Sequence, residues 1–332
     1  MSENNKKKVC AAVIIGRNEG ERLVSCLESL LASLDVVVYV DSGSSDNSLE
    51  EASRRGVHCL PLDLSIPFTA ARARNEGVEY LFKKHSDLKY IQFVDGDCEV
   101  QPEWVGEAQN FLDNNSQYAV VCGRRRERYP NNSIYNQLCD IEWNTPVDDA
   151  LACGGDALVR AAAFKQVGGY RDDLIAGEEP EMCFRLRANG WKIYRLDAEM
   201  TLHDAAITHF SQWWNRAKRA GYAYAGGYDL HGRSAEKFKR KQVFSIIVWA
   251  FMIPVIIILL AFQNYLLLGL FVIFPVQVLR LMLKEQSRLS SYKLAWFYAL
   301  SNVVGKFPQF IGIVKFITNK MRGRKATLIE YK

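Results

Sequence analysis

Short apolar runs alternate with amphipathic segments along the first two hundred residues of the chain. The runs Val9 to Ile15, Asp35 to Val40 and Val57 to Leu62 have the length and composition of buried strands. Between the first two, residues 21–33 carry leucines at helical spacing. A strand, a helix and a second strand in this order form a right-handed parallel unit. The pattern therefore predicts an α/β fold with a mostly parallel sheet flanked by helices.

The same alternation continues as far as residue 203. Further strands are predicted at residues 90–94, 118–122, 192–196 and 199–203. Further helices are predicted at residues 49–55, 70–84, 102–112, 161–167 and 182–190. The segment Asn131 to Asp149 has no clear period, so an irregular connection is expected there.

One apolar run ends in paired carboxylates. The stretch Tyr90 to Glu99 reads YIQFVDGDCE, and Gly96 separates Asp95 from Asp97. Open α/β sheets bind their ligands at the carboxyl ends of the strands. Two hard oxygen ligands at such a place suit Mg²⁺ or Mn²⁺ carrying a diphosphate. The alternative is that Asp95 and Gly96 form a hairpin turn, for which Asp-Gly is a strong signal.

Other polar groups also stand at the ends of predicted elements. Asp41 follows the second strand, where a carboxylate can accept a hydrogen bond from a base or ribose. Ser45 or Asp46 nearby could equally cap the next helix. Arg72 and Arg74 lie in the first half of the helix at residues 70–84, where the helix dipole disfavours cations. The pair indicates an anionic partner such as phosphate, unless both are solvated surface charges.

Carboxylates also gather before the helix at residues 182–190. Glu178, Glu179 and Glu181 open it, and they either complement the helix dipole or supply a general base that faces the site. His203 ends the last predicted strand, and a neutral histidine there is either a metal ligand or a structural residue.

The C-terminal third has a different pattern. Residues 243–262 carry no charge and are long enough to span the hydrocarbon core of a bilayer, and residues 265–283 continue apolar after a Gln-Asn turn. Basic flanks on both sides of this hairpin put its two ends in the cytoplasm. Residues 294–317 are apolar but interrupted by Lys306, Pro308 and Lys315, which favours an interfacial or re-entrant helix. The sequence thus predicts a catalytic domain over residues 1–230 and a membrane domain over residues 231–332.

Charge supports this division. From residue 233 onward there are 16 Lys or Arg against 3 Asp or Glu, whereas the preceding residues carry 26 against 34. A basic excess in the apolar part indicates a membrane surface, and a basic tail of Lys320, Arg322, Arg324 and Lys325 would meet anionic lipid. No nucleic-acid-binding motif accompanies it, so no nucleic-acid partner is expected.

The cysteines and the N-terminus point to a reducing compartment. The eight cysteines are scattered without a C-x-x-C pair or histidines at zinc spacing. The first residues, MSENNKKK, lead into a strand without the apolar stretch of a signal peptide. The catalytic part is therefore expected in the cytoplasm, with the chain held in the cytoplasmic membrane as a multi-pass protein.

The ordered motifs VIIGRNEG, VVVYVDSGSSDNS, ARARNEG, FVDGDCE and GEEPEMCFRLRANGW resemble those of family-2 glycosyltransferases of the GT-A fold. The resemblance covers residues 9–224. It implies an inverting transfer of a sugar from a nucleotide diphosphate sugar to an acceptor hydroxyl, with Mg²⁺ or Mn²⁺ as cofactor.

The resemblance assigns roles by position. It implies that Asp41 contacts the nucleobase beside the first loop. It implies that Asp95 and Asp97 form the D-x-D pair, with Asp97 as the more direct metal ligand and Asp95 shared between metal and nucleotide sugar. The remaining residues implied to bind the nucleotide sugar or the metal are Arg17, Asn18 and Glu19 of the first loop, Arg74, and His203.

The chain departs from the family's pattern at two places. The family usually has Glu-Asp where this chain has Glu178 and Glu179, so Glu179 takes the position of the base and Glu178 is the second choice. Polymerising members carry Q-x-x-R-W. Here the stretch Gln212-Trp213-Trp214-Asn215-Arg216 has a glutamine and an arginine but the wrong order of tryptophan, and the resemblance implies that Arg216 contacts the nucleotide sugar. The mismatch argues against processive polymerisation.

The sequence leaves the acceptor open between several classes. Membrane attachment favours a lipid-linked sugar as acceptor, in polysaccharide or glycolipid synthesis. The alternatives are transfer to polyprenyl phosphate itself, or a catalytically inactive scaffold that binds a nucleotide sugar.

Overall fold

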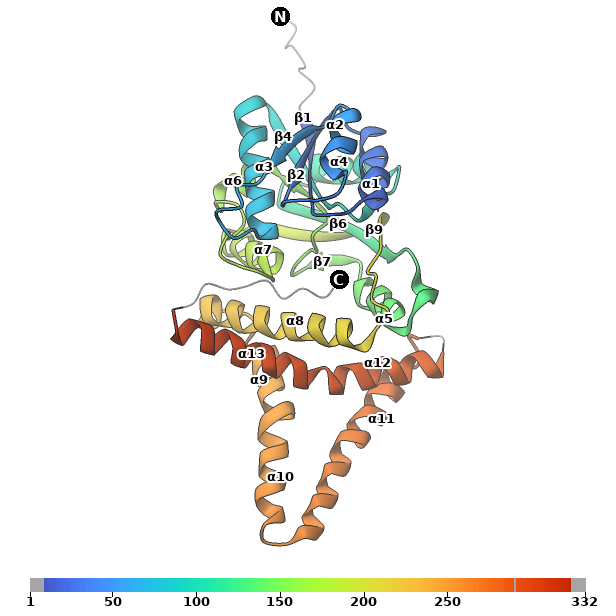
Figure 1. The fold of residues 1–332 in the computed structure, drawn as a ribbon, viewed down its shortest axis with the longest axis vertical. Coiled ribbons are helices and arrows are strands. Elements are labelled where there is room, and N and C mark those ends of the chain that lie inside the picture. The colour runs from blue at the N-terminus through green and yellow to red at the C-terminus, as the bar shows by residue number, and fades with distance from the viewer. Residues whose placement is uncertain (1–8, 290, 324–332) are drawn as a thin grey trace, which may run out of the picture. The chain divides into compact units, whose positions relative to one another are not determined.

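The computed structural model describes residues 9–289 and 291–323 of the chain (Figure 1). The chain divides into two compact units. The first comprises Met1–Arg128 and Glu142–Ala205, and the second comprises Tyr129–Ile141 and Ala206–Lys332. The predicted tail residues Arg324 and Lys325, and the N-terminal residues 1–8, lie outside the described residues.

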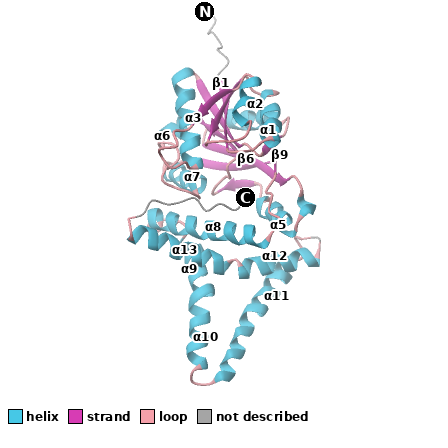
Figure 2. Cartoon of the chain, in the orientation of Figure 1, coloured by secondary structure: helices cyan, strands magenta, loops and turns pink. Residues whose placement is uncertain are grey.

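All described strands belong to the first unit and form one sheet (Figure 2). The strands are β1 (Val9–Gly16), β2 (Val36–Asp41), β3 (His58–Pro61), β4 (Leu88–Asp95), β5 (Cys98–Val100), β6 (Tyr118–Glu127), β7 (Asp148–Ala150), β8 (Ala157–Arg160) and β9 (Lys192–His203). Their order is β3-β2-β1-β4-β8-β6-β9-β5, with β7 paired to β9. β1, β2, β3, β4, β6 and β9 run in one direction, and β5, β7 and β8 run in the other. The predicted α/β fold with a mostly parallel sheet is confirmed.

The central strands form the core because both faces of the sheet are covered. Val13, Ile14, Phe93 and Val94 on β1 and β4 are fully buried. Strands that are buried on both faces read as continuous apolar runs, which explains why the sequence revealed them. The helices of this unit are α1 (Glu21–Leu31), α2 (Ser48–Arg54), α3 (Ala70–Lys84), α4 (Trp104–Asn114), α6 (Ala161–Gln166) and α7 (Glu178–Ala188).

Several local expectations are corrected by the structure. The segment expected to be irregular contains a 3₁₀ turn η1 (Pro130–Asn132), the helix α5 (Ile134–Trp143) and β7. The two short strands expected at residues 192–203 are one continuous strand, β9, because β6 pairs with it along its length despite register shifts. The Asp-Gly hairpin does not form, since β4 pairs with β1 and β8 whereas β5 pairs with β9.

The second unit is helical. Its elements after α5 are α8 (Phe210–His231), α9 (Arg240–Ile247), η2 (Val248–Met252), α10 (Ile253–Ala261), η3 (Tyr265–Val272), α11 (Ile273–Glu285), α12 (Tyr292–Val304) and α13 (Lys306–Met321). α8 and α13 lie side by side (Figure 1), and the backbone carbonyl of Gln309 lies 2.0 Å from where a Cβ on Gly221 would stand. Glycine therefore permits the contact between the two helices.

Two helical segments are long and apolar enough to cross a membrane. They are Arg240–Ala261 and Tyr265–Glu285, and only 17% and 6% of their most apolar windows are buried. A π-helical turn, η2, interrupts the first just before Pro254, which lacks the N–H that a regular helix would use. The third apolar segment, expected to be one helix, is divided at Gly305 into α12 and α13. Pro308 accounts for the break because it cannot donate to the carbonyl four residues before it.

Candidate active site

The carboxyl ends of the parallel strands bring three predicted site residues to one edge of the sheet. Asp41 ends β2, Asp95 ends β4, and His203 ends β9. Asp156 immediately precedes β8, which runs in the opposite direction, so it stands at the same edge. This is the edge at which sheets of this kind bind ligands.

Arg74 on α3 joins two of the predicted groups. Its Nη2 donates to Asp95 Oδ1 at 2.7 Å, and its Nη1 donates to Glu178 Oε1 at 3.0 Å. The same Nη1 lies 3.3 Å from Glu179 Oε1. Its guanidinium also lies 5.5 Å from the centre of the Tyr170 ring. The arginine is 2% exposed, so these contacts act at low dielectric and are stronger than surface ion pairs.

Opposing effects set the pKa values of two of the three carboxylates that face this arginine, Asp95 and Glu179. Burial raises the pKa of Asp95, but Arg74 and Arg125 outweigh burial, and the pKa lies below its ordinary value. Burial and the neighbouring charge of Glu178 raise the pKa of Glu179 to about 7, despite the opposing effect of Arg74. Glu179 is thus a carboxylate that changes protonation near neutral pH.

A second arginine, on β6, forms the other side of the cluster. Arg125 Nη2 lies 2.8 Å from Asp156 Oδ2 and 3.9 Å from Asp95 Oδ2. Asp156 is fully buried and also accepts hydrogen bonds from the backbone N–H of Asp95 at 3.3 Å and from Thr201 Oγ1 at 2.8 Å. A Cβ on Gly155 would lie 2.6 Å from Arg74 Nη2. Glycine there lets the loop before β8 approach the pair of Arg74 and Asp95.

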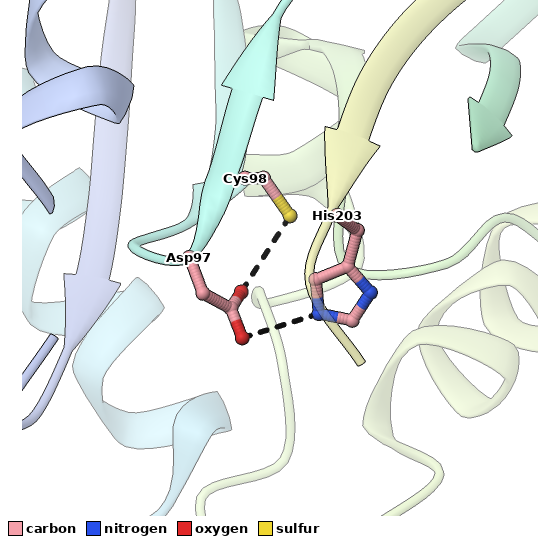
Figure 3. A group of neighbouring side chains, drawn as sticks. All are labelled: Asp97, Cys98 and His203. Atoms are coloured by element: carbon pink, nitrogen blue, oxygen red, sulfur yellow. Dashed lines mark hydrogen bonds and ion pairs between the residues drawn. The ribbon is translucent and has the colours of Figure 1, made fainter. Parts of the chain in front are cut away.

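Asp97, Cys98 and His203 form a compact group that could hold a metal ion (Figure 3). Asp97 Oδ2 and His203 Nε2 lie 3.2 Å apart, and the possible ligand atoms of all three residues lie within 4.8 Å of one another. His203 Nδ1 is buried and has no hydrogen-bond partner among the described residues. Burial raises the pKa of the Cys98 thiol, which donates to Asp97 Oδ1 at 3.6 Å.

This donor set fits a divalent cation. A carboxylate oxygen and an imidazole nitrogen that converge suit Mn²⁺, and Mg²⁺ accepts the oxygen ligands. The sulfur of Cys98 is a poor ligand for either ion, because Mg²⁺ and Mn²⁺ prefer hard oxygen ligands to soft sulfur. Asp97 and His203 are therefore the residues of this group that would hold the ion. Asp95, also predicted as a ligand, pairs with the arginines and forms a second possible group with Cys98 and Asp156.

The first loop and the end of β2 form a hydrogen-bonded unit. Asp41 Oδ2 accepts from the backbone N–H groups of Gly43 at 2.9 Å and Ser44 at 2.8 Å, and Oδ1 accepts from Tyr39 Oη at 2.9 Å. Asn18, which has a positive φ of 56°, accepts at Oδ1 from the backbone N–H of Ser45 at 2.7 Å. Asp41 thus orders the loop that follows it.

The remaining predicted residues are divided between the units. Arg17 stacks on the Phe68 ring at 4.9 Å, and Glu19 pairs with Arg22 at 2.8 Å. Arg216 is half-buried on α8 in the second unit. The structure thus brings Arg74, Asp95, Glu178 and Glu179 into direct contact, and it also brings Asp97 and His203 together.

Sequence reasoning missed three residues of this site. Arg125 was one of several arginines in a basic run, and Asp156 followed two glycines without a recognised role. Trp143 fell in the segment expected to be irregular, yet its ring lies 4.8 Å from that of His203. The apolar residues around Asp156 gave no sign that it lies in the site. The two glycines directly before it, at the start of a strand, could have suggested a buried carboxylate that holds the loop in place.

Comparison with known proteins identifies the domain. Residues 11–165 match the profile described as Glycosyl transferase family 2. These residues form a glycosyltransferase family 2 domain. The match contains Asp41, Arg74 and both aspartates of the D-x-D pair, whereas Glu179 and His203 lie beyond it. The resemblance inferred from the motifs is confirmed.

The chain also resembles solved structures. The mannosyltransferase PcManGT from Pyrobaculum calidifontis, in complex with GDP-Man and Mn2+, is 15% identical, and the match covers 93% of this chain and 87% of that chain at a TM-score of 0.63. S. aureus TarS 1–349 is 14% identical over 95% of this chain and 92% of that chain, at a TM-score of 0.48. A comparison with curated protein sequences finds no match. At such identities the likeness to PcManGT establishes the fold.

Proposed function

We propose that this glycosyltransferase is an inverting, metal-dependent enzyme that transfers a sugar from a nucleotide diphosphate sugar to a lipid-linked sugar at the cytoplasmic face of a membrane. The observation that carries the proposal is the contact of Arg74 with Asp95 on one side and Glu178 and Glu179 on the other. It links the D-x-D motif to the candidate base, as a single displacement at one carbon requires.

Glu179 is the base in this proposal. Its pKa of about 7 suits proton transfer at neutral pH. Its side chain is 16% exposed, against 5% for Glu178, so it is the more accessible to an acceptor. Glu179 takes the proton of the acceptor hydroxyl while the oxygen forms a bond to the anomeric carbon. The bond from that carbon to the diphosphate breaks on the opposite face, its electron pair leaves with the diphosphate, and the configuration inverts.

Cations must balance the charge that develops on the departing diphosphate. A divalent ion held by Asp97 and His203 would supply Lewis-acid stabilisation of that charge. The GDP-Man and Mn2+ bound by PcManGT, which shares the fold, support a nucleotide sugar and a divalent ion as partners here. Asp41 orders the loop that follows β2. It is the proposed contact for the nucleobase, together with Arg17, Asn18 and Glu19 of the loop after β1.

Membrane attachment supports the lipid-linked acceptor. The two apolar segments expose large side chains such as Leu259, Phe262, Tyr265 and Leu266, each more than half exposed. The core helix of a water-soluble protein would bury such residues, whereas a bilayer satisfies them. A site on a membrane-bound chain meets acceptors that are confined to the same membrane.

Donor turnover tests the proposal directly. The purified full chain in lipid nanodiscs would be given a panel of UDP- and GDP-sugars with Mn²⁺, first without acceptor and then with polyprenyl phosphate or with polyprenyl-linked oligosaccharides. We expect one donor to be turned over, chelation with EDTA to stop the reaction, and Asp97→Ala to be inactive. A lone sugar on polyprenyl phosphate as the product would refute the acceptor, and nucleotide binding without any product would refute the enzyme.

A further inference from the structure

Trp143, the last residue of α5, lies beside both halves of the site. The Arg125 guanidinium lies 5.6 Å from the centre of its ring. The His203 ring lies 4.8 Å away at an interplanar angle of 46°, so the two rings are tilted rather than stacked. The catalytic steps described above give this tryptophan no role.

Trp143 is a large aromatic side chain that stays partly exposed beside charged groups. It is only partly buried. Trp104, by contrast, is fully buried, and its indole N–H donates to Gln92 Oε1 at 2.9 Å. Burial of an aromatic side chain stabilises a fold in proportion to the apolar area removed from water. A tryptophan that stays partly in solvent contributes less of this stabilisation to the fold. Trp143 is such a tryptophan, and it lies at the carboxyl edge of the sheet.

The neighbours of Trp143 connect it to the reacting groups. Arg125 pairs with Asp156 at 2.8 Å and approaches Asp95 at 3.9 Å. His203 lies 3.2 Å from Asp97. The indole therefore contacts Arg125, which pairs with Asp156 and approaches Asp95, and His203, which lies beside Asp97. A ligand held against it would be in reach of both.

We propose that Trp143 is the platform on which a pyranose ring of the sugar substrate packs. One face of a pyranose presents C–H groups that fit against an aromatic ring, while its hydroxyls form hydrogen bonds with surrounding charged groups. The site of Trp143 offers both, because the Arg125 guanidinium and the His203 imidazole lie against the indole and the carboxylates of Asp156 and Asp97 lie next to those two groups. This inference rests on the proposed function and specifies the chemistry of its substrate: the packed group is a sugar ring, of the donor or of the acceptor.

A purely structural role makes a different prediction. If Trp143 only shielded Arg125 and His203 from water, an aliphatic side chain of similar bulk would replace it. If it packs on a sugar ring, only another flat aromatic side chain would do so. Trp143→Phe, Trp143→Leu and Trp143→Ala separate the two roles, and Trp191→Ala is the matched control. Trp191 is also a half-buried tryptophan of the first unit, but its indole N–H bonds to Gln166.

The test measures binding and turnover separately. Calorimetry in the presence of Mn²⁺ compares each UDP- or GDP-sugar with UDP or GDP alone, and needs no turnover. Kinetics with the active donor compare octyl glycosides with octyl phosphate, which has no ring, as acceptors. We expect Trp143→Leu and Trp143→Ala to lower the affinity for the sugar-bearing ligand roughly tenfold, and Trp143→Phe to bind it nearly as well as the wild type. The affinity for the nucleotide alone should not change.

The ligand whose binding is weakened identifies which sugar ring packs on Trp143. A loss of affinity confined to nucleotide sugars means that the donor sugar packs on Trp143, and a raised KM confined to octyl glycosides means that the acceptor sugar does. Rescue by leucine, or an equal loss for ligands without a ring, would overturn the platform. Failure of the wild-type chain to turn over any donor would instead refute the proposed function, and calorimetry with nucleotide sugars and with octyl glycosides would still decide the platform.

Discussion

Arg74 allows several carboxylates to gather within the protein. Asp95, Glu178 and Glu179 would repel one another without a shared cation, and removing the partner of a buried charge destabilises a protein strongly. Arg74 is held by α3, and its pKa is well above the ordinary value because the attraction of these carboxylates outweighs burial. It therefore remains a cation at any pH at which the protein is folded.

Glu179→Gln tests the base through both activity and stability. We expect kcat to fall by about 10²- to 10⁴-fold, the usual contribution of a general base. In the wild type, kcat/KM should decline as the pH falls below about 7, because Glu179 then becomes protonated. The raised pKa means that the folded chain holds a proton that the unfolded chain releases above pH 4.5, so wild-type stability declines as the pH rises from 4.5 to about 7. The glutamine variant escapes this decline and should be more stable above pH 7, on the order of 2 kcal/mol.

Glu178→Gln is the matched control for this prediction. Glu178 contacts the same Arg74 nitrogen but is less exposed. Glu178→Gln should keep the acidic limb of the pH profile but move it to lower pH, because the charge of Glu178 helps to raise the pKa of Glu179. pH–rate profiles and thermal unfolding between pH 5 and 8, taken for both variants, measure these effects. Loss of the acidic limb in Glu178→Gln, with Glu179→Gln active, would reverse the assignment.

Gly155→Ala should disrupt the site from the backbone side. A Cβ there would lie 2.6 Å from Arg74 Nη2 and 2.7 Å from Asp95 Oδ2, so the ion pair would have to move. At Gly154 the nearest atom is Arg125 Nη2 at 3.5 Å, an ordinary contact. We expect Gly155→Ala to lower kcat/KM more than tenfold and the stability by about 1–3 kcal/mol, and Gly154→Ala to change neither. Equal effects of the two alanines on donor turnover and melting temperature would contradict this account.

Elements were predictable from the sequence where local signals agree, and contacts were not. α3 occupies the predicted residues 70–84, because apolar periodicity continues to its end and Thr69 caps its start by accepting from the N–H of Arg72. α5 was missed because it is short and mixes polar and apolar residues. The edge position of the D-x-D motif follows from the strand that precedes it. The pairing of Arg125 with Asp156 joins residues 31 positions apart across antiparallel strands, and no local pattern records such a contact.

The pair α8 and α13 depends on glycine at two crossing points. A Cβ on Gly221 would lie 2.0 Å from the Gln309 carbonyl oxygen, and one on Gly312 would lie 2.1 Å from the Lys218 carbonyl oxygen. In a helix, Gly→Ala on its own favours folding by up to about 1 kcal/mol. Here the clash with backbone should reverse the sign, and we expect each alanine to destabilise the second unit by about 1–3 kcal/mol.

Gly269→Ala is the control for these two variants. Gly269 lies in η3 with no atom within 4 Å of its added Cβ, so the substitution should be neutral or stabilising. Thermal unfolding of the full chain in nanodiscs, followed by tryptophan fluorescence, measures the three variants under the same conditions. A gain in stability in Gly221→Ala or Gly312→Ala would show that the helices do not cross at these residues.

The chain as a whole is proposed to be anchored by a hairpin whose two ends are both cytoplasmic. Each apolar segment has about the length that crosses a bilayer, because 22 and 21 residues at about 1.5 Å per residue exceed the thickness of the hydrocarbon core. Basic residues flank the hairpin, including Lys241 before it and Lys284 after it, and such residues are retained on the cytoplasmic side. The turn at Gln263 must then emerge on the opposite side.

Labelling of single introduced cysteines in intact cells decides this topology. Gln263 and Ser287 are both exposed in the structure, one at the turn and one after the second apolar segment. We expect a membrane-impermeant maleimide to label Gln263→Cys in intact cells and Ser287→Cys only after lysis. The parent chain is the control, because most of its own cysteines are buried and none is fully exposed. Protection of Gln263→Cys in intact cells would mean that the hairpin enters the membrane and returns without crossing it, and the catalytic unit would then be attached by a monotopic anchor.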